Sequence, residues 1–199
     1  MAKIKFTKNE LKRQKDALKR FLRYLPTLML KKQQLQMEIR KIEAQAAELR
    51  RNRELCFREI HQWIALFGED VAFAELITVT SVDTEIGNIA GVDIPVFQDI
   101  HFEVAPYDLF ELPLWVDTAI EKVKELASMD ARIGILAKQA ELLDEELRIT
   151  SQRVNLFEKV KIPETRENIR TIQIYLGDEQ TAAVVRGKIA KKKLVRVNQ

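Results

Sequence analysis

The side chains in this sequence that are best suited to chemistry are two histidines and one cysteine. Cys56 and His61 stand five residues apart, but no further ligands accompany them at the spacing of a zinc site. We interpret Cys56 as a small core residue and His61 as a surface or boundary residue. The sequence therefore predicts no metal site around them.

Patterns for catalysis and phosphate binding are also absent. Gly187 precedes Lys188, but the first glycine and the hydroxyl residue of a phosphate-binding loop are missing. The acidic run 144–146 fits a solvated helix face, and no nucleophile is paired with a base. We therefore predict a protein that is not an enzyme and that needs no cofactor.

Charge is strongly segregated along the chain. Residues 69–117 include eleven Asp or Glu and no Lys or Arg, whereas residues 1–23 include nine Lys or Arg and two acids. After Glu179 there are six Lys or Arg and no acid. If the two chain ends lie together, one end of the molecule is basic and the other acidic, which would orient it among charged partners.

Composition narrows the class of protein. No apolar run approaches the roughly 18 residues of a membrane-spanning helix, and residues 1–5 lack the apolar stretch of a signal peptide. A single cysteine excludes an intrachain disulfide framework and fits a reducing compartment. We expect a cytoplasmic protein without direct membrane insertion.

The first third of the chain carries a heptad pattern, which predicts a coiled-coil helix. Pro26 lies within it and predicts a kink or a helix break. The pattern is interrupted at Gln14, Lys32 and Arg53. Its two series are Leu11, Leu18, Leu25, Lys32, Ile39, Ala46, Arg53, Ile60, Phe67 and Gln14, Phe21, Leu28, Leu35, Ile42, Leu49, Cys56, Trp63.

The last third repeats this pattern and then slips by one residue beside Pro163, which predicts a local change of supercoil. After the slip, apolar residues resume at Ile162, Ile169, Leu176 and Ala183, with Ile172 between them. The series before the slip are Leu112, Ala119, Leu126, Ile133, Ala140, Leu147, Val154, Lys161 and Trp115, Lys122, Met129, Leu136, Leu143, Thr150, Phe157.

Between these helices, a segment rich in Gly, Pro and β-branched residues predicts a β-hairpin that turns near residues 88–91. In its second strand, alternation would place apolar residues on one face, with Gln98 as the exception. That predicted face comprises Val92, Ile94, Val96, Ile100, Phe102 and Val104. It would pack either on the helices or on a partner.

The predicted fold is mainly α, a long antiparallel two-helix coiled coil with a small β-hairpin between the helices. We divide the chain into an N-terminal helix (1–67), an acidic linker with the hairpin (68–113) and a C-terminal helix (114–199). If Phe67 packs near Trp115, Leu11 lies near residue 171. Residues beyond about 175 then extend on the order of 35 Å past the hairpin of helices.

This basic overhang has three interpretations, because a lone helix needs outside contacts for stability. It could be a solvated terminus, a nucleic-acid-binding tail or a helix inserted into a protein cavity. No aromatic residue follows Tyr175, so a nucleic-acid tail would lack a platform for base stacking.

Three motifs, in this order along the chain, resemble the D-type rotor protein of V/A-type rotary ATPases. The N-terminal helix is similar at Thr7-Lys8, Leu11-Lys12 and residues 30–35, and the central turn is similar at residues 91–95, Gly-Val-Asp-Ile-Pro. The third motif is Arg153-Val154-Asn155-Leu156-Phe157-Glu158, followed by Val160, Ile162-Pro163, Ile169, Ile172 and Leu176.

The resemblance implies a non-catalytic central rotor axle that transmits torque between an ATP-hydrolysing or ATP-synthesising hexamer and a membrane ring that moves H⁺ or Na⁺. Implied partners are the hexamer of catalytic and non-catalytic subunits, a small F-type stalk subunit and a socket subunit on the ring. We expect contacts to the hexamer from Arg166, Arg170, Lys188, Lys191, Lys192 and Lys193. The alternatives are a prefoldin-like chaperone subunit and a nucleic-acid-binding coiled coil.

Overall fold

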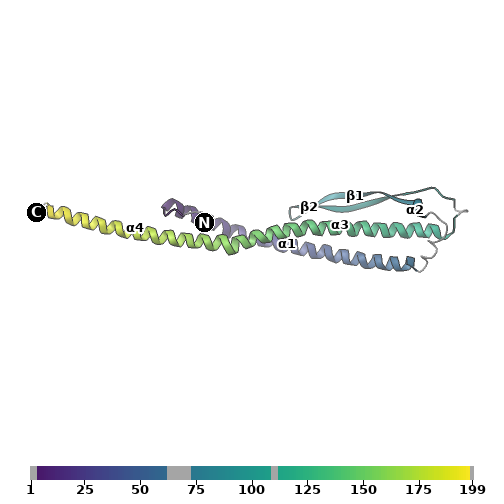
Figure 1. Cartoon of the computed structure of the whole chain (residues 1–199), viewed down its shortest axis with the longest axis horizontal. Coiled ribbons are helices and arrows are strands. Elements are labelled where there is room, and N and C mark those ends of the chain that lie inside the picture. The colour runs from purple at the N-terminus through teal and green to yellow at the C-terminus, as the bar shows by residue number, and fades with distance from the viewer. Residues whose placement is uncertain (1–3, 62–72, 109–111, 198–199) are drawn as a thin grey trace. The chain divides into compact units, whose positions relative to one another are not determined.

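The computed structural model describes residues 4–61, 73–108 and 112–197. Its elements are labelled in Figure 1, and the predicted mainly α fold with a β-hairpin between long helices is confirmed. Trp63 and Phe67, the last predicted heptad positions of the first helix, lie outside the described residues. In chain order the elements are α1 (Lys8–His61), α2 (Phe73–Leu76), β1 (Ile77–Ile89), β2 (Val92–Val104), α3 (Trp115–Asn155), a π-helix (Leu156–Lys161) and α4 (Ile162–Val197).

The chain divides into two compact units. The first unit combines residues 1–31 with residues 150–199, and the second comprises residues 32–149. The first therefore contains the beginning of α1, the π-helix and α4, whereas the second contains the rest of α1, the hairpin and most of α3.

The heptad positions of α1 form its buried stripe. Every described member of the two predicted series, from Leu11 to Ile60, is buried or half-buried. Two of the three interruptions have polar partners: Gln14 donates to Glu10 at 2.8 Å, and Arg53 donates to Asp130 of α3 at 2.5 and 3.3 Å. The heptad prediction is confirmed for the described part of α1 because its predicted positions are buried or half-buried.

Contacts within each unit show that the helices are antiparallel. In the first unit, the rings of Phe6 and Tyr175 lie 4.9 Å apart and those of Phe21 and Phe157 lie 5.2 Å apart. In the second unit, Arg53 pairs with Asp130 and Glu59 pairs with Lys122, so residue numbers rise along α1 as they fall along α3. The predicted register, in which Leu11 lies near residue 171, differs from the observed pairs by one residue at Phe6 and Arg53 and by four residues at Phe21.

Pro26 does not break the first helix, because α1 continues without interruption from Lys8 to His61. The break offered as one alternative was therefore wrong. Packing of Phe21, Leu25 and Leu28, which are half-buried on both sides of the proline, opposes the cost of the missing backbone donor. Beside it, the Thr27 hydroxyl donates to the Tyr24 carbonyl at 2.8 Å.

The π-helix explains the predicted phase slip near Pro163. The backbone N–H of Ile162 bonds to the carbonyl of Phe157, five residues earlier, so one residue is added relative to an α-turn. The slip prediction is confirmed: Val154 is buried before the π-helix, and Ile162 and Ile172 are buried after it. Ala183, the last predicted position of the series, is exposed. Without the extra residue, the later apolar positions would rotate away from α1.

The hairpin turns at Ala90 and Gly91, close to the predicted position. Both residues have positive φ angles, 53° and 81°, as a two-residue hairpin loop of type I′ requires. The Asn88 side chain accepts a hydrogen bond from the Gly91 N–H at 3.1 Å and donates to Asp93 at 2.7 Å. These bonds close the turn and fix the pairing of Ile89 with Val92.

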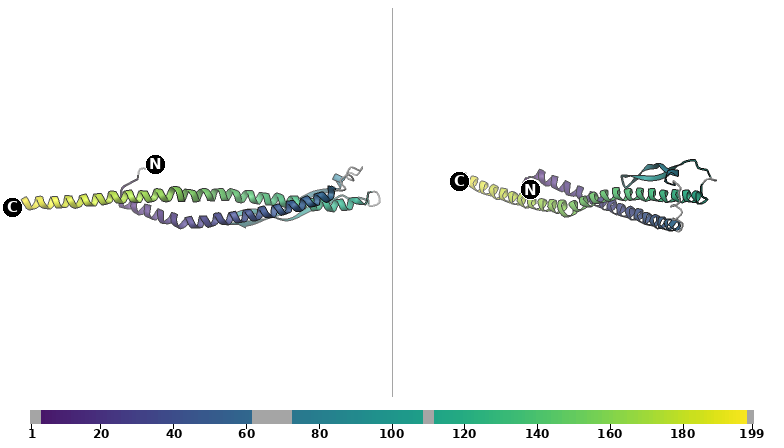
Figure 2. Two further views of the ribbon diagram at one scale, coloured as in Figure 1. Left: turned by 90° about the horizontal axis from the view of Figure 1, so that it is seen from below. Right: turned by 45° about the vertical axis from the view of Figure 1, so that its right-hand side comes forward.

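The turn end of the hairpin packs on both helices of the second unit. Ile94 joins Leu35, Ile39 and Ile42 of α1 and Leu143 of α3 in one buried cluster. Figures 1 and 2 show the hairpin lying along α3. The hairpin therefore packs on the helices, one of the two possibilities that the sequence left open.

A β-bulge changes which residues of β2 face the helices. Asp83 pairs with Asp99 but Thr84 pairs with Phe97, so Gln98 is an extra residue. Since one added residue reverses the alternation, Val96 and Ile100 lie on opposite faces of the ribbon. The single predicted apolar face is wrong for this reason. Of the predicted residues, Val96 is exposed, whereas Val92, Ile94, Ile100, Phe102 and Val104 are buried or half-buried, as is Phe97.

Candidate protein-interaction surface

The geometry around Cys56 opposes a reactive role. The thiol is buried and donates to the Glu125 carboxylate at 3.7 Å. Burial, with a smaller contribution from the negative charge of Glu125, raises the pKa of the thiol. The nucleophilic thiolate is therefore disfavoured. Beside it, Lys122 donates to Glu59 and Glu125 at 3.1 Å each, and these bonds raise the pKa of the Lys122 ammonium.

The histidines lie in separate, ordinary settings. His61 stacks on Phe57 with ring centroids 6.3 Å apart, and His101 lies 3.0 Å from Asp83 on the exposed hairpin. Among the residues that the structure describes, no three His, Cys, Asp or Glu side chains come together as a metal site would require. Nor does a described helix combine the length and apolarity of a membrane span.

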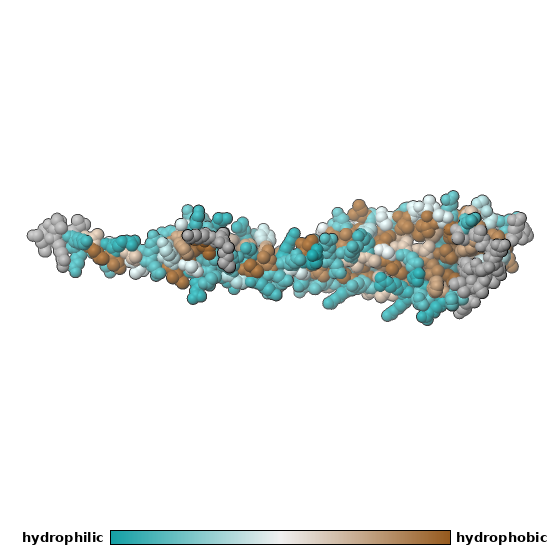
Figure 3. Space-filling view, viewed as in Figure 1, coloured by the Kyte–Doolittle hydropathy of each residue, from teal (hydrophilic) through white to brown (hydrophobic). Residues whose placement is uncertain are grey.

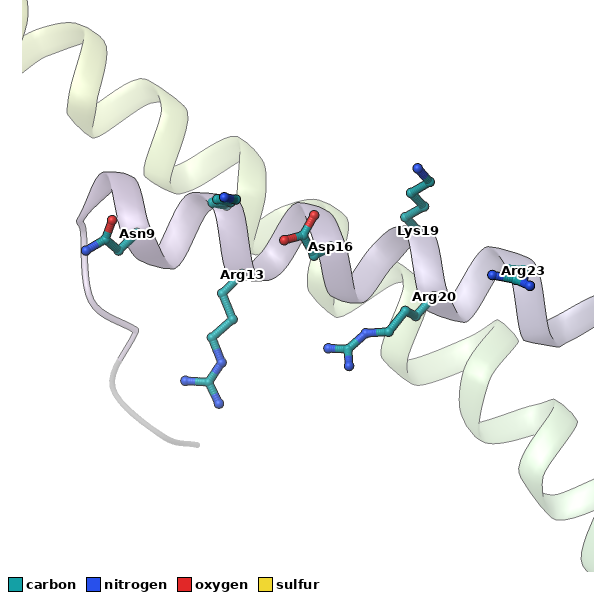
Figure 4. Close-up of a pocket in the computed structure, with 7 residues that line it drawn as sticks. Asn9, Arg13, Asp16, Lys19, Arg20 and Arg23 are labelled. Atoms are coloured by element: carbon teal, nitrogen blue, oxygen red, sulfur yellow. The ribbon is translucent and has the colours of Figure 1, made fainter.

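The first turns of α1 carry a basic surface that the sequence analysis had counted but not assigned to a site. Its side chains line an open hollow of about 690 Å³, and Figure 4 shows them projecting from one helix. Asp16 is the acid among them. The others are Asn9, Lys12, Arg13, Lys19, Arg20 and Arg23. The high density of Lys and Arg in residues 1–23 was the sequence signal for this surface. The residues share one helix face because they are spaced three, four and seven apart along the chain.

The C-terminal part of α4 is exposed to solvent. After Leu176, every residue to Lys193 except Ala182 is exposed, although the helix continues. Figure 3 shows hydrophobic residues interspersed among hydrophilic ones there. The exposed apolar side chains are Val184, Val185 and Ile189. This segment therefore leaves both apolar and basic side chains uncovered.

The predicted contact residues occupy two stretches of α4. Arg166 and Arg170 are exposed on the part that packs along α1, and Arg170 lies 4.0 Å from Glu167. Lys188 is 22 residues beyond Arg166, or about 33 Å along a helix, and Lys191, Lys192 and Lys193 follow it. The structure therefore brings the four lysines together but does not bring the two arginines to them.

These observations define a class of protein: an antiparallel two-helix coiled coil with exposed basic side chains on its helices and no reaction centre in the described residues. Comparison with known proteins agrees. A sequence model of the ATP synthase D-subunit family matches residues 10–192. The chain belongs to this family, and it is a non-catalytic stalk subunit of a V-type rotary ATPase.

Relatives extend over nearly the whole chain. The V-type ATP synthase D-subunit protein of Borreliella burgdorferi is 54% identical over 199 residues, covering 100% of this chain and 98% of the relative. The protein of the same name from Chlamydia pneumoniae is 35% identical and covers 96% and 93%. That from Chlamydia muridarum is 35% identical and covers 97% of each. Neither the chaperone nor the nucleic-acid alternative gains support.

Proposed function

We propose that this subunit is the central rotor axle, which transmits torque between the ATP-hydrolysing or ATP-synthesising hexamer and a membrane ring that moves H⁺ or Na⁺. The observation that carries the proposal is the exposed end of α4, residues 177–193, which continues beyond the ring contact of Tyr175 with Phe6, just before α1 begins. An exposed helix of this length needs external contacts to be stable. A surrounding ring of subunits would supply them.

An axle must also present different surfaces in different directions. Where α1 and α4 pack together in the first unit, the rod has two helices, and beyond Tyr175 it has one. This asymmetry supports a role in which three catalytic interfaces meet unlike faces at any instant. Close-packed heptad layers, with Phe21 against Phe157, would resist sliding of one helix on the other under torque.

Charged contacts to the hexamer would come from Arg166, Arg170, Lys188, Lys191, Lys192 and Lys193. Exposed cations at a rim contribute little each and favour encounter over tight locking. Weak, distributed contacts suit a rotor, because a ligand that binds one state much more tightly would hold the motor in that state.

The test replaces Lys191, Lys192 and Lys193 by Gln and measures assembly with the remaining ATPase subunits and ATP-driven ion pumping. We expect assembly to weaken by roughly 3- to 150-fold, from three exposed charge pairs. The matched control replaces Lys41, Lys124 and Lys138, which lie in the second unit, and changes the charge equally. Unchanged assembly and pumping in the first variant would reject the proposed contacts.

We further propose that the acidic end contacts the small F-type stalk subunit and the socket subunit on the membrane ring. The protein would then lie in the cytoplasm, peripheral to the membrane as part of a membrane-bound complex. The eleven acids and absent Lys and Arg of residues 69–117 support a basic partner there. Purification of the tagged chain should recover these subunits together with the hexamer, and recovery of unfolded client proteins or nucleic acid instead would contradict the assignment.

A further inference from the structure

The outer strand of the hairpin is unusually exposed. All nine residues from Thr78 to Ile86 in β1 are exposed, whereas β2 has buried or half-buried residues along its whole length. The hairpin thus rests on the helices mainly through β2 and leaves β1 open.

Three apolar side chains of β1 lie on this open surface. Val79 is 46% exposed, Val82 41% and Ile86 79%. Val82 and Ile86 are four residues apart and share a face, and the irregularity at Thr80 brings Val79 to the same face. Figure 3 shows hydrophobic residues gathered over the hairpin. Exposed apolar side chains grouped on one strand mark an interaction surface.

The backbone of β1 is also open along one edge. β1 is 13 residues long, and in the described part of the chain it belongs to a two-stranded sheet with β2 as its neighbour. Proteins commonly protect such edges with Lys, Pro or very short strands. β1 contains neither Lys nor Pro and is rich in β-branched residues, so it is suited to pairing with another strand.

We propose that the β1 edge binds an extended, basic segment of another subunit by β-strand addition, an inference that rests on the proposed function. Charge selects the occupant, since the two strands together carry five acids and no Lys or Arg. Asp83 and Glu85 of β1 would repel a second copy of β1 and attract a basic segment. Backbone pairing would give affinity and the apolar side chains would give register.

The first experiment measures amide hydrogen exchange across β1 in the isolated chain and in the assembled ATPase. Residues 78–86 should exchange at least about tenfold more slowly in the complex, because added backbone bonds protect amides. Equal exchange in both states would overturn the inference. Protection that appears in the isolated chain at high concentration would overturn it as well, because it would show that the occupant is a second copy.

The second experiment compares Val82→Lys with Val82→Glu, which remove the same apolar side chain and add opposite charges. Binding of each variant to the remaining ATPase subunits is titrated after circular dichroism shows that both fold. Val82→Lys should bind at least about tenfold more weakly than Val82→Glu. Equal binding would reject a basic occupant. If the unaltered chain failed to join the ATPase, the proposed function would fall, whereas assembly with an unprotected β1 would overturn this inference alone.

Discussion

The cluster around Leu143 gives a quantitative test of how the second unit is held together. Leu143 is fully buried and packs with Leu35 of α1 and Ile94 of the hairpin. Leu143→Ala removes the equivalent of three buried methylene groups, or about 2.4 kcal/mol of transfer free energy. The remaining cavity adds to this, so the free energy of unfolding should fall by about 3 kcal/mol.

Urea unfolding of the full chain, followed by circular dichroism, measures this loss, and hydrogen exchange of the hairpin amides assigns it to the second unit. Val184→Ala is the control, because Val184 is 58% exposed on the overhang, and its effect should stay within about 0.5 kcal/mol. A loss below about 1 kcal/mol for Leu143→Ala, or hairpin amides that keep their protection, would refute the packing of hairpin and helices around this side chain.

Three further predictions concern stability and reactivity. Gly91→Ala should lower the free energy of unfolding in urea by about 1 kcal/mol because φ is 81° at this position. Gly134→Ala lies within α3 with open space around the added Cβ, and it should raise the free energy of unfolding by up to about 1 kcal/mol. Changes of the same sign in both variants would contradict the turn geometry. Cys56 should be alkylated far more slowly than free cysteine. Because burial raises the pKa of this thiol in the folded state, the stability that it contributes is present below its ordinary pKa of 9.0 and is lost as pH rises above that value. A free energy of unfolding that does not change between pH 8 and 10 would count against this prediction. A double-mutant cycle on Arg53 and Asp130 should give a coupling below about 1 kcal/mol because both side chains are partly exposed, and a larger value would show a less solvated pair.

The helices followed from the sequence because their signal is local and periodic. A 3.5-residue repeat specifies which side of a helix is apolar, and every described member of the first helix's series is at least half-buried. The slip beside Pro163 was also visible, since a one-residue insertion shifts all later positions. The turn at residues 88–91 followed from turn chemistry.

The bulge at Gln98 could not be predicted, because Val96 and Phe97 are both apolar and either could face the helices. Continuity of α1 through Pro26 depended on packing on both sides of the proline, which a local rule omits. For the candidate site, the basic residues and their two groups along the last helix could be read from the sequence, whereas the exposure of the helix beyond Leu176 is a result of the structure.

Taken alone, the sequence determined the two coiled-coil helices, the hairpin between them, the charged ends and the family, because periodicity, turn residues and charge are properties of the chain read in order. The tertiary structure decided where the hairpin packs, which of its residues face the helices and which strand remains open. Those outcomes depend on contacts among α1, β2 and α3, residues far apart in sequence, whose burial is settled only when all three elements meet.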